Sequence, residues 1–177
     1  MRMPEGLKLL FSRDQIEEAV RRLGAEISSD YRGRCPLLIG VLKGAFMFLA
    51  DLLRHLSIPV EVDFVRLSSY GCRTETSGVV RMTKELESDI RGRDVIVVED
   101  IVDTGLSLKF LLEELRAQGP SSLRVCALVD KRARREVEVR VDYVGFEIEE
   151  GFIVGYGIDY AERYRELPEI YVLEEGT

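Results

Sequence analysis

The chain of 177 residues has a length that one domain with an ordinary hydrophobic core can fill. Its composition, 46% hydrophobic and 32% charged, is typical of a soluble globular protein and excludes an intrinsically disordered chain. A formal net charge of −7 argues against a general affinity for nucleic acids or acidic membranes, and no run approaches the ~20 apolar residues of a membrane-spanning helix. We therefore expect a single domain over residues 1–177, with no nucleic-acid or membrane partner.

The cysteines and the first residues indicate where the protein resides. Cys35, Cys72 and Cys126 are odd in number and widely spaced, which argues against a disulfide framework or a zinc site and favours a reducing compartment. The opening residues, MRMPEGLKLLF, lack the long apolar stretch of a signal peptide. We therefore expect a cytoplasmic protein.

The first predicted element is a helix over Arg13–Asp30. Ser12, with Gln15 three residues later, has the pattern of a capping box. Apolar residues then recur at helical spacing (Ile16, Ala19, Val20, Leu23 and Ile27).

The next elements alternate between strand and helix. Cys35–Leu42 is a short, continuously apolar run, as expected of a strand that is covered on both faces. Gly44–Leu56 has the composition of a mostly buried helix, and Val60–Leu67 alternates as a strand would. Tyr70–Gly78 is polar and contains glycines, so it is our best candidate for a mobile loop.

The second half repeats this alternation. Buried strands are predicted at Asp94–Asp100 and Leu123–Val129, with a helix over Leu106–Gln118 between them. Further strands are expected at Tyr143–Ile148, Phe152–Tyr156 and Ile170–Leu173. Apolar strands that alternate with helices predict an α/β fold with a mostly parallel sheet. Ligands of such sheets bind beyond the carboxyl ends of the strands, here at Leu42–Lys43, Glu99–Thr104 and Val129–Lys131.

The segment VVEDIVDTGLSL, residues 97–108, is typical of an anion site. Thr104-Gly105-Leu106-Ser107 connects the predicted strand to a helix, whose first backbone N–H groups and dipole favour a negative ligand. Two hydroxyl groups and a glycine that lets the backbone approach closely suit a phosphate monoester. The sequence contains neither the P-loop pattern nor a complete dinucleotide fingerprint.

Three carboxylates accompany this predicted phosphate site. Glu99 and Asp100 can accept hydrogen bonds from ribose hydroxyl groups, either directly or through a bound Mg²⁺, and Asp103 is a candidate base. The alternative is structural: the same acids would end a strand and cap the next helix.

These residues together resemble the phosphoribosyl-pyrophosphate (PRPP) motif of the phosphoribosyltransferases. An Asp at position 103 is typical of the 6-oxopurine branch, the hypoxanthine-guanine phosphoribosyltransferases. The resemblance extends from about Leu7 to the C-terminus. It implies the type I phosphoribosyltransferase fold, in which helices flank a central, mostly parallel sheet and the N- and C-terminal parts form a small hood.

The resemblance also implies roles for residues outside this motif. In LKGAFMF, Lys43 and Gly44 would belong to the pyrophosphate loop, with a cis peptide between Leu42 and Lys43. Ser69 and Tyr70 would belong to a flexible loop that closes over the reaction. Lys131 would reach the exocyclic oxygen of the purine; without the resemblance, it would be an ordinary surface lysine.

The C-terminal segment GFIVGYGIDYAERYRELP supplies the remaining site residues of the resemblance. Phe152 would stack on the purine, and the backbone of Ile153 would pair with its edge, although by themselves both residue types are more often core. Asp159 would join Glu99 and Asp100 in holding Mg²⁺, and Arg165 would bind pyrophosphate. Two positions depart from the family pattern: Leu106 and Ser107 stand where a polar residue and a threonine are common.

The implied activity is purine salvage. The 5-phosphoribosyl group of PRPP would pass to N9 of hypoxanthine, and also of guanine, giving IMP or GMP and pyrophosphate, with Asp103 as general base. A homodimer or homotetramer is expected from the family. Two alternatives stay open: a regulatory protein of the same fold that senses PRPP or nucleotides and binds RNA or DNA, and an enzyme that prefers xanthine.

Overall fold

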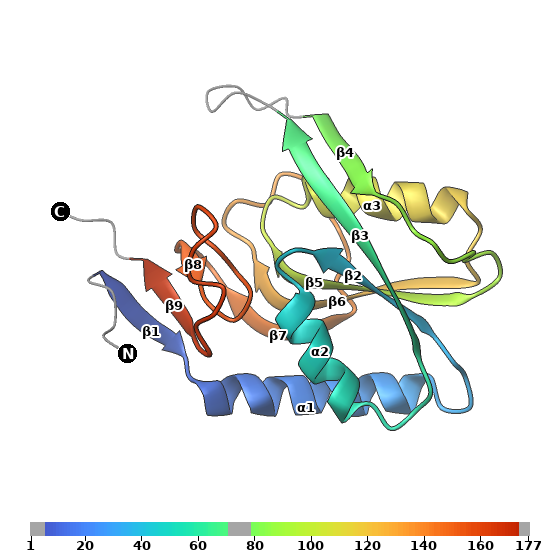
Figure 1. Ribbon diagram of the computed structural model, residues 1–177, viewed down its shortest axis with the longest axis horizontal. Helices are drawn as coiled ribbons and strands as arrows, with labels where there is room; N and C mark the ends of the chain where they lie inside the picture. The colour runs from blue at the N-terminus through green and yellow to red at the C-terminus, as the bar shows by residue number, and fades with distance from the viewer. Residues whose placement is uncertain (1–5, 71–78, 174–177) are drawn as a thin grey trace.

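The computed structural model describes residues 6–70 and 79–173 (Figure 1). The helices are α1 (Arg13–Asp30), α2 (Phe46–His55) and α3 (Leu106–Ala117). The strands are β1 (Leu7–Phe11), β2 (Leu37–Leu42), β3 (Glu61–Tyr70), β4 (Val79–Lys84), β5 (Asp94–Val102), β6 (Ser122–Lys131), β7 (Tyr143–Ile148), β8 (Ile153–Val154) and β9 (Ile170–Leu173). In this part of the chain, no helix has the length and apolar character needed to cross a membrane.

A six-stranded sheet in the order β4-β3-β2-β5-β6-β7 forms the centre of the molecule. Its strand pairs are parallel except for β3 with β4, which confirms the predicted α/β fold with a mostly parallel sheet. From β2 the chain crosses through α2 to β3 on one side, whereas from β5 it crosses through α3 to β6 on the other. The neighbours β2 and β5 therefore flank a topological switch point, where ligands of such sheets bind.

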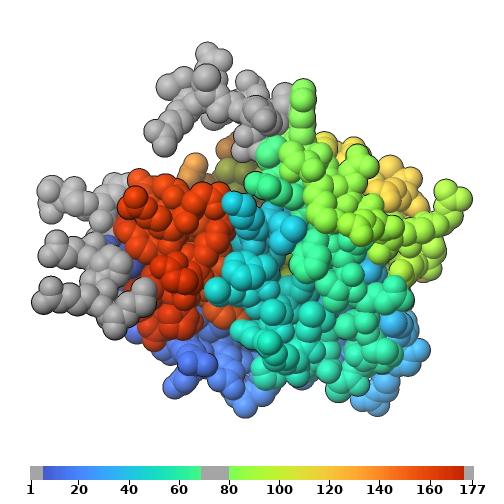
Figure 2. All heavy atoms as spheres, in the orientation of Figure 1, coloured from blue at the N-terminus to red at the C-terminus, as the bar shows by residue number. Residues whose placement is uncertain are grey.

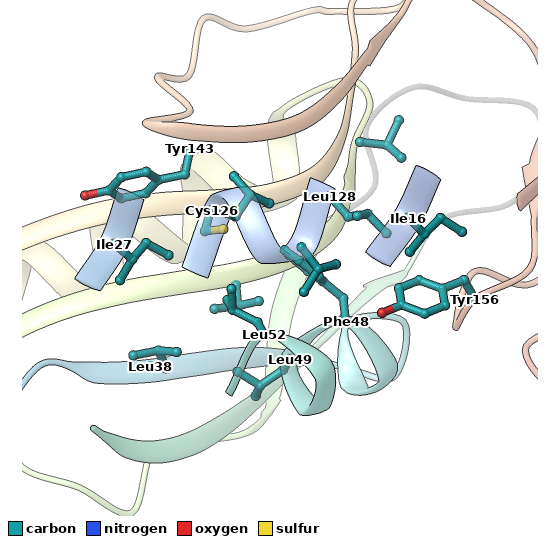
Figure 3. Packing of buried hydrophobic residues seen from close by; sticks show 14 of the residues in the cluster. Ile16, Ile27, Leu38, Phe48, Leu49, Leu52, Cys126, Leu128, Tyr143 and Tyr156 are labelled. Atoms are coloured by element: carbon teal, nitrogen blue, oxygen red, sulfur yellow. The ribbon is translucent and has the colours of Figure 1, made fainter. Parts of the chain in front are cut away.

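The continuously apolar strands divide their side chains between two faces of the sheet. Leu38 in β2 and Ile96 in β5 lie in the cluster that contains α1 and α2, whereas their chain neighbours Leu37 and Val95 pack with α3. This alternation explains why β2 and residues 95–98 of β5 are apolar without interruption. Figure 3 shows the first cluster, with Ile16 and Ile27 of α1 packed near Phe48 and Leu52 of α2.

The predicted start of α1 is confirmed at the level of single hydrogen bonds. The Ser12 backbone N–H donates to Gln15 Oε1 at 2.9 Å, and the Gln15 backbone N–H donates to Ser12 Oγ at 3.3 Å. These two bonds satisfy backbone donors that a helix end would otherwise leave free.

A second sheet of three strands, in the order β1-β9-β8, joins the N-terminal and C-terminal parts of the chain, as the expected hood requires. Phe11 at the end of β1 stacks on Phe146 of β7, with the ring centroids 3.9 Å apart. Tyr156, just after β8, donates from its hydroxyl to Asp51 Oδ2 of α2 at 2.6 Å. Figure 2 shows the C-terminal segment, coloured red, beside the cyan segment that contains α2.

Several element boundaries differ from those expected. β5 continues two residues past the predicted Asp94–Asp100, to Val102, so Glu99 and Asp100 do not end the strand. The predicted strand Phe152–Tyr156 is reduced to β8, because Gly155 and Tyr156 take positive φ values of 103° and 50° and turn the chain. Tyr70 still belongs to β3, and residues 71–78 of the predicted loop lie outside the described residues.

Candidate active site

The candidate site lies where β2 and β5 end beside each other at the switch point. The chain leaves β5 at Val102, turns through residues 103–105 and enters α3 at Leu106. We call residues 103–105 the β5–α3 turn. A cavity of about 140 Å³ opens at this turn and is lined by Glu99, Ile101, Val102, Asp103, Thr104, Gly105, Ser107 and Leu108.

Gly105 is required by the shape of this turn. Its φ of +86° is a left-handed conformation that side-chain-bearing residues rarely adopt. A Cβ at this position would also lie 2.8 Å from the carbonyl oxygen of Val137. The structure thus brings Thr104, Gly105 and Ser107 to the cavity at the N-terminal end of α3, where backbone N–H groups and the helix dipole favour an anion.

Glu99 and Asp100 form a close acidic pair at the end of β5. Asp100 is buried, and its backbone N–H donates to Glu99 Oε1 at 3.2 Å. Burial and the charge of Asp100 raise the pKa of Glu99 well above its usual range, and burial also raises the pKa of Asp100. Two hard oxygen ligands that repel each other in this way fit Mg²⁺, which proteins often hold through one or two carboxylates plus oxygens of the substrate.

The expected third metal ligand does not join this pair. Among residues 6–70 and 79–173, no three His, Cys, Asp or Glu side chains gather as ligands for one ion. Asp159 Oδ1 lies 2.8 Å from Arg165 Nη2, and its Oδ2 accepts a hydrogen bond from the Glu162 backbone at 2.9 Å. In this structure, Asp159 therefore orients the loop that carries Arg165.

Gly44, which follows Lys43, lies against the Asp100 carboxylate, and Arg165 is close enough for its charge to act on that group. The Leu42–Lys43 peptide is cis, as expected, and a Cβ on Gly44 would overlap the carboxylate of Asp100. Arg165 Nη1 donates to the Gly157 carbonyl at 2.7 Å. The charge of Arg165 lowers the pKa of Asp100, but burial raises this pKa by more.

A carboxylate that sequence reasoning missed connects these two cations. Glu162 Oε2 lies 2.9 Å from Lys43 Nζ and 3.4 Å from Arg165 Nη2. Lys43 and Arg165 therefore converge on one anionic group, which is what a pyrophosphate site would require of them.

Lys131 and Asp103 face each other at the ends of β6 and β5. Lys131 is only 5% exposed, and its Nζ lies 3.7 Å from Asp103 Oδ2. Arg134 Nη1, a second cation, lies 3.6 Å from the same oxygen. Among the described residues, the other oxygen, Oδ1, is buried and accepts no hydrogen bond. Because buried polar atoms are normally paired, this oxygen is suited to receive a donor from a ligand.

The residues expected at the purine differ in exposure. Phe152 is 46% exposed and meets Tyr160 edge to face, with the centroids 5.3 Å apart, so the alternative of a core phenylalanine is wrong. Ile153 is buried in the main core cluster, which leaves its backbone as the available group. The backbones of Ser69 and Tyr70 end β3, and their side chains lie outside the described parts of the structure.

Comparison with known proteins agrees with this arrangement. Residues 10–161 match the family model described as phosphoribosyl transferase domain. The chain is 47% identical over 170 residues to the hypoxanthine-guanine phosphoribosyltransferase of Bacillus subtilis, covering 96% of this chain and 94% of that protein.

Solved structures give the same result. A hypoxanthine-guanine phosphoribosyltransferase from Bacillus anthracis matches with a TM-score of 0.89 and 47% identity, covering 93% of this chain and 97% of that one. A hypoxanthine phosphoribosyl transferase from Trypanosoma cruzi matches with a TM-score of 0.91 and 41% identity, over 98% and 95% of the two chains. The chain therefore belongs to the hypoxanthine-guanine phosphoribosyltransferases, a family of transferase enzymes with the type I phosphoribosyltransferase fold.

Proposed function

We propose that this enzyme transfers the 5-phosphoribosyl group of PRPP to N9 of hypoxanthine or guanine, giving IMP or GMP and pyrophosphate. The observation that carries this proposal is the pairing of Asp103, the first residue of the β5–α3 turn, with buried Lys131 next to the cavity at the start of α3. The cavity at the turn is suited to a 5′-phosphate, and the Asp103 carboxylate beside Lys131 is suited to a nucleobase.

The base chemistry follows from the two partners. A carboxylate can accept the proton that the purine loses as N9 attacks, and the buried Oδ1 of Asp103 is the oxygen without a partner among the described residues. An ammonium carries donors only, so Lys131 would hydrogen-bond the 6-oxo group of hypoxanthine or guanine and would oppose the amino group of adenine. Purine binding would therefore turn Lys131 from Asp103 toward the substrate.

Departure of pyrophosphate requires that its negative charge be stabilised. Lys43 and Arg165 are the cations that would hold it, after Glu162 gives up its place between them. Glu99 and Asp100 would hold Mg²⁺ together with oxygens of PRPP, and the ion would neutralise charge as pyrophosphate leaves. Asp159 would then keep Arg165 in place, in addition to any contact with the metal.

The remaining expectations complete this proposal. Phe152, with Tyr160 at its edge, would stack on the purine, and the Ile153 backbone would pair with its rim. The segment that follows Ser69 and Tyr70 would exclude water from the cationic sugar of the transition state. The enzyme would act in the cytoplasm as a homodimer or homotetramer.

A purine panel tests the proposal. With PRPP and Mg²⁺, spectrophotometric assays should show turnover of hypoxanthine and guanine, and removal of the metal with EDTA should abolish it. Adenine should react at least ~10⁴-fold more slowly, since a site built around one hydrogen bond rejects a partner that cannot make it. Comparable adenine turnover would refute the role of Lys131, and xanthine turnover above that of hypoxanthine would favour the xanthine alternative.

A further inference from the structure

Arg135, in the loop after β6, connects the ends of β5 and β6 through its side chain. Its Nε donates to the Asp103 carbonyl at 2.9 Å, and its Nη2 lies 3.3 Å from the carbonyl oxygens of both Val102 and Lys131. The residues at which the two strands end, Val102 and Lys131, and the base candidate, Asp103, thus share one guanidinium group.

A buried carboxylate holds this guanidinium in place. Asp130 is 3% exposed and accepts a hydrogen bond from Arg135 Nη2. Arg132 Nε, on an exposed side chain, approaches the other oxygen of Asp130 at 3.2 Å. Arg135 is itself mostly buried, and its planar guanidinium holds its donors in fixed directions, so that one side chain reaches a carboxylate and three carbonyls.

The backbone after Arg135 continues the same contact. The N–H groups of Glu136 and Val137 both donate to the Thr104 carbonyl, at 2.9 and 3.2 Å. The carbonyls of residues 102, 103 and 104 therefore all accept hydrogen bonds from the segment 135–137.

This pattern determines where the amide groups of the turn point. In a trans peptide, the C=O and the following N–H point in opposite directions. Carbonyls directed toward residues 135–137 therefore direct the N–H groups of Asp103, Thr104 and Gly105 away from them. Consecutive N–H groups that point the same way form a concavity for anions. The cavity at the turn agrees with this direction, because its lining includes Thr104 and Gly105 and none of residues 135–137.

We propose that Arg135 is a positioning residue: anchored on Asp130, it fixes the β5–α3 turn so that the turn's amide groups and the Asp103 carboxylate face the substrate. This inference rests on the proposed function, since it assigns the turn to the sugar phosphate. Arg135 touches no reacting atom and acts through residues 102–104.

Arg135→Lys tests the inference, because it keeps a positive charge near Asp130 and removes the fork. Isothermal titration with ribose 5-phosphate should show affinity reduced roughly 10-fold or more, as expected when hydrogen bonds that fix a site are lost. The KM for PRPP should rise and kcat should fall. A merely structural role would lower the melting temperature and the folded fraction, with affinity and kcat per folded molecule unchanged.

Two further variants make the result decisive. Arg132→Gln removes a neighbouring arginine that also contacts Asp130 but reaches none of the three carbonyls, and it should bind ribose 5-phosphate within about twofold of the wild type. The double variant R135Q/D130N removes the buried carboxylate together with its partner. It should also bind ribose 5-phosphate roughly 10-fold or more weakly than the wild type, so it provides the same test if R135K fails to fold.

The outcomes separate this inference from the proposed function. Wild-type affinity for ribose 5-phosphate in folded R135K or in R135Q/D130N would overturn the positioning role, while the wild-type enzyme still converts PRPP and hypoxanthine. A wild-type chain that neither binds ribose 5-phosphate nor converts PRPP would overturn the proposed function and this inference with it.

Discussion

At the scale of single residues, the proposed catalysis depends on the side chain of Asp103. Replacing it with Asn keeps its size but removes the ability to accept a proton. We expect Asp103→Asn to lower kcat by roughly 10²–10⁴-fold, the usual contribution of a general base, while PRPP affinity changes only a few-fold. Steady-state kinetics and titration calorimetry with PRPP measure the two effects. Unchanged turnover would show that another group takes the proton.

Gly44 makes a second prediction at this scale. A Cβ at Gly44 would overlap the Asp100 carboxylate, so Gly44→Ala must displace that carboxylate or the loop. We expect kcat/KM for PRPP to fall roughly 100-fold, the cost of a misplacement of about 1 Å near the chemistry. Gly33→Asn is a suitable control, because a Cβ there meets nothing within 4 Å and Asn tolerates the left-handed φ of +76°. Equal losses in both variants would point to general destabilisation.

The sequence predicted some site residues and missed others for a physical reason. Glu99, Asp100 and the β5–α3 turn were predictable because they follow one another along the chain. Glu162 meets Lys43 across 119 residues and Arg135 meets Asp103 across 32, and no local pattern records such contacts. That Gly44 must be a glycine was also invisible in the sequence, since the clashing carboxylate belongs to β5, which is distant along the chain.

At the scale of elements, Asp63 anchors the connection between β4 and β5 to β3. Its Oδ2 accepts hydrogen bonds from the backbone N–H groups of Glu87 and Ser88, both at 2.9 Å, and its Oδ1 accepts from Phe64 at 2.7 Å. Burial alone raises the pKa of Asp63, but the backbone donors outweigh it, so the pKa lies below its ordinary value.

This carboxylate predicts a pH-dependent contribution to stability. Because the folded-state pKa is the lower one, the stabilisation is present above about pH 4 and is lost as the pH falls through the folded value. Asp63→Asn would place an amide donor against backbone donors. We therefore expect urea unfolding at pH 7 to show a free energy of unfolding lower by about 1–3 kcal/mol.

The loss of unfolding free energy in Asp63→Asn should shrink below pH 4, because the Asp63 carboxylate of the wild type becomes protonated there. Glu61→Gln, which removes an exposed carboxylate that pairs with Arg93, should cost at most about 1 kcal/mol. If the difference in unfolding free energy between the wild type and D63N stayed constant down to pH 2, it would contradict the lowered pKa of Asp63.

Elements with strong patterns were predictable, and two strands with weak patterns were not. α1 was predicted with its boundaries because a capping box precedes a full apolar stripe. β1 and β4 were missed: β1 is five residues long and partly exposed, and β4, VVRMTK, is six residues long without a regular alternation of apolar and polar residues. Both depend on a partner strand elsewhere in the chain for their pairing.

At the scale of the whole molecule, two sheets meet around the site. The main sheet supplies Lys43 after β2, the β5–α3 turn after β5, and Lys131 at the end of β6. The segment that follows β8 supplies Asp159, Glu162 and Arg165. The contact between Lys43 and Glu162 joins these two parts directly. The type of fold could be predicted from alternating elements, but the strand order, and with it the switch point, could not.

The most direct test of the central claim is a crystal structure of the enzyme soaked with IMP. We expect the 5′-phosphate on the amide groups of the β5–α3 turn, with the ribose hydroxyls toward Glu99 and Asp100. The hypoxanthine ring should lie beside Asp103, and Lys131 Nζ should have moved from the carboxylate to the 6-oxo oxygen. A nucleotide whose sugar phosphate lies away from the turn, with Asp103 still paired to Lys131, would contradict the proposed roles of the turn and of Asp103.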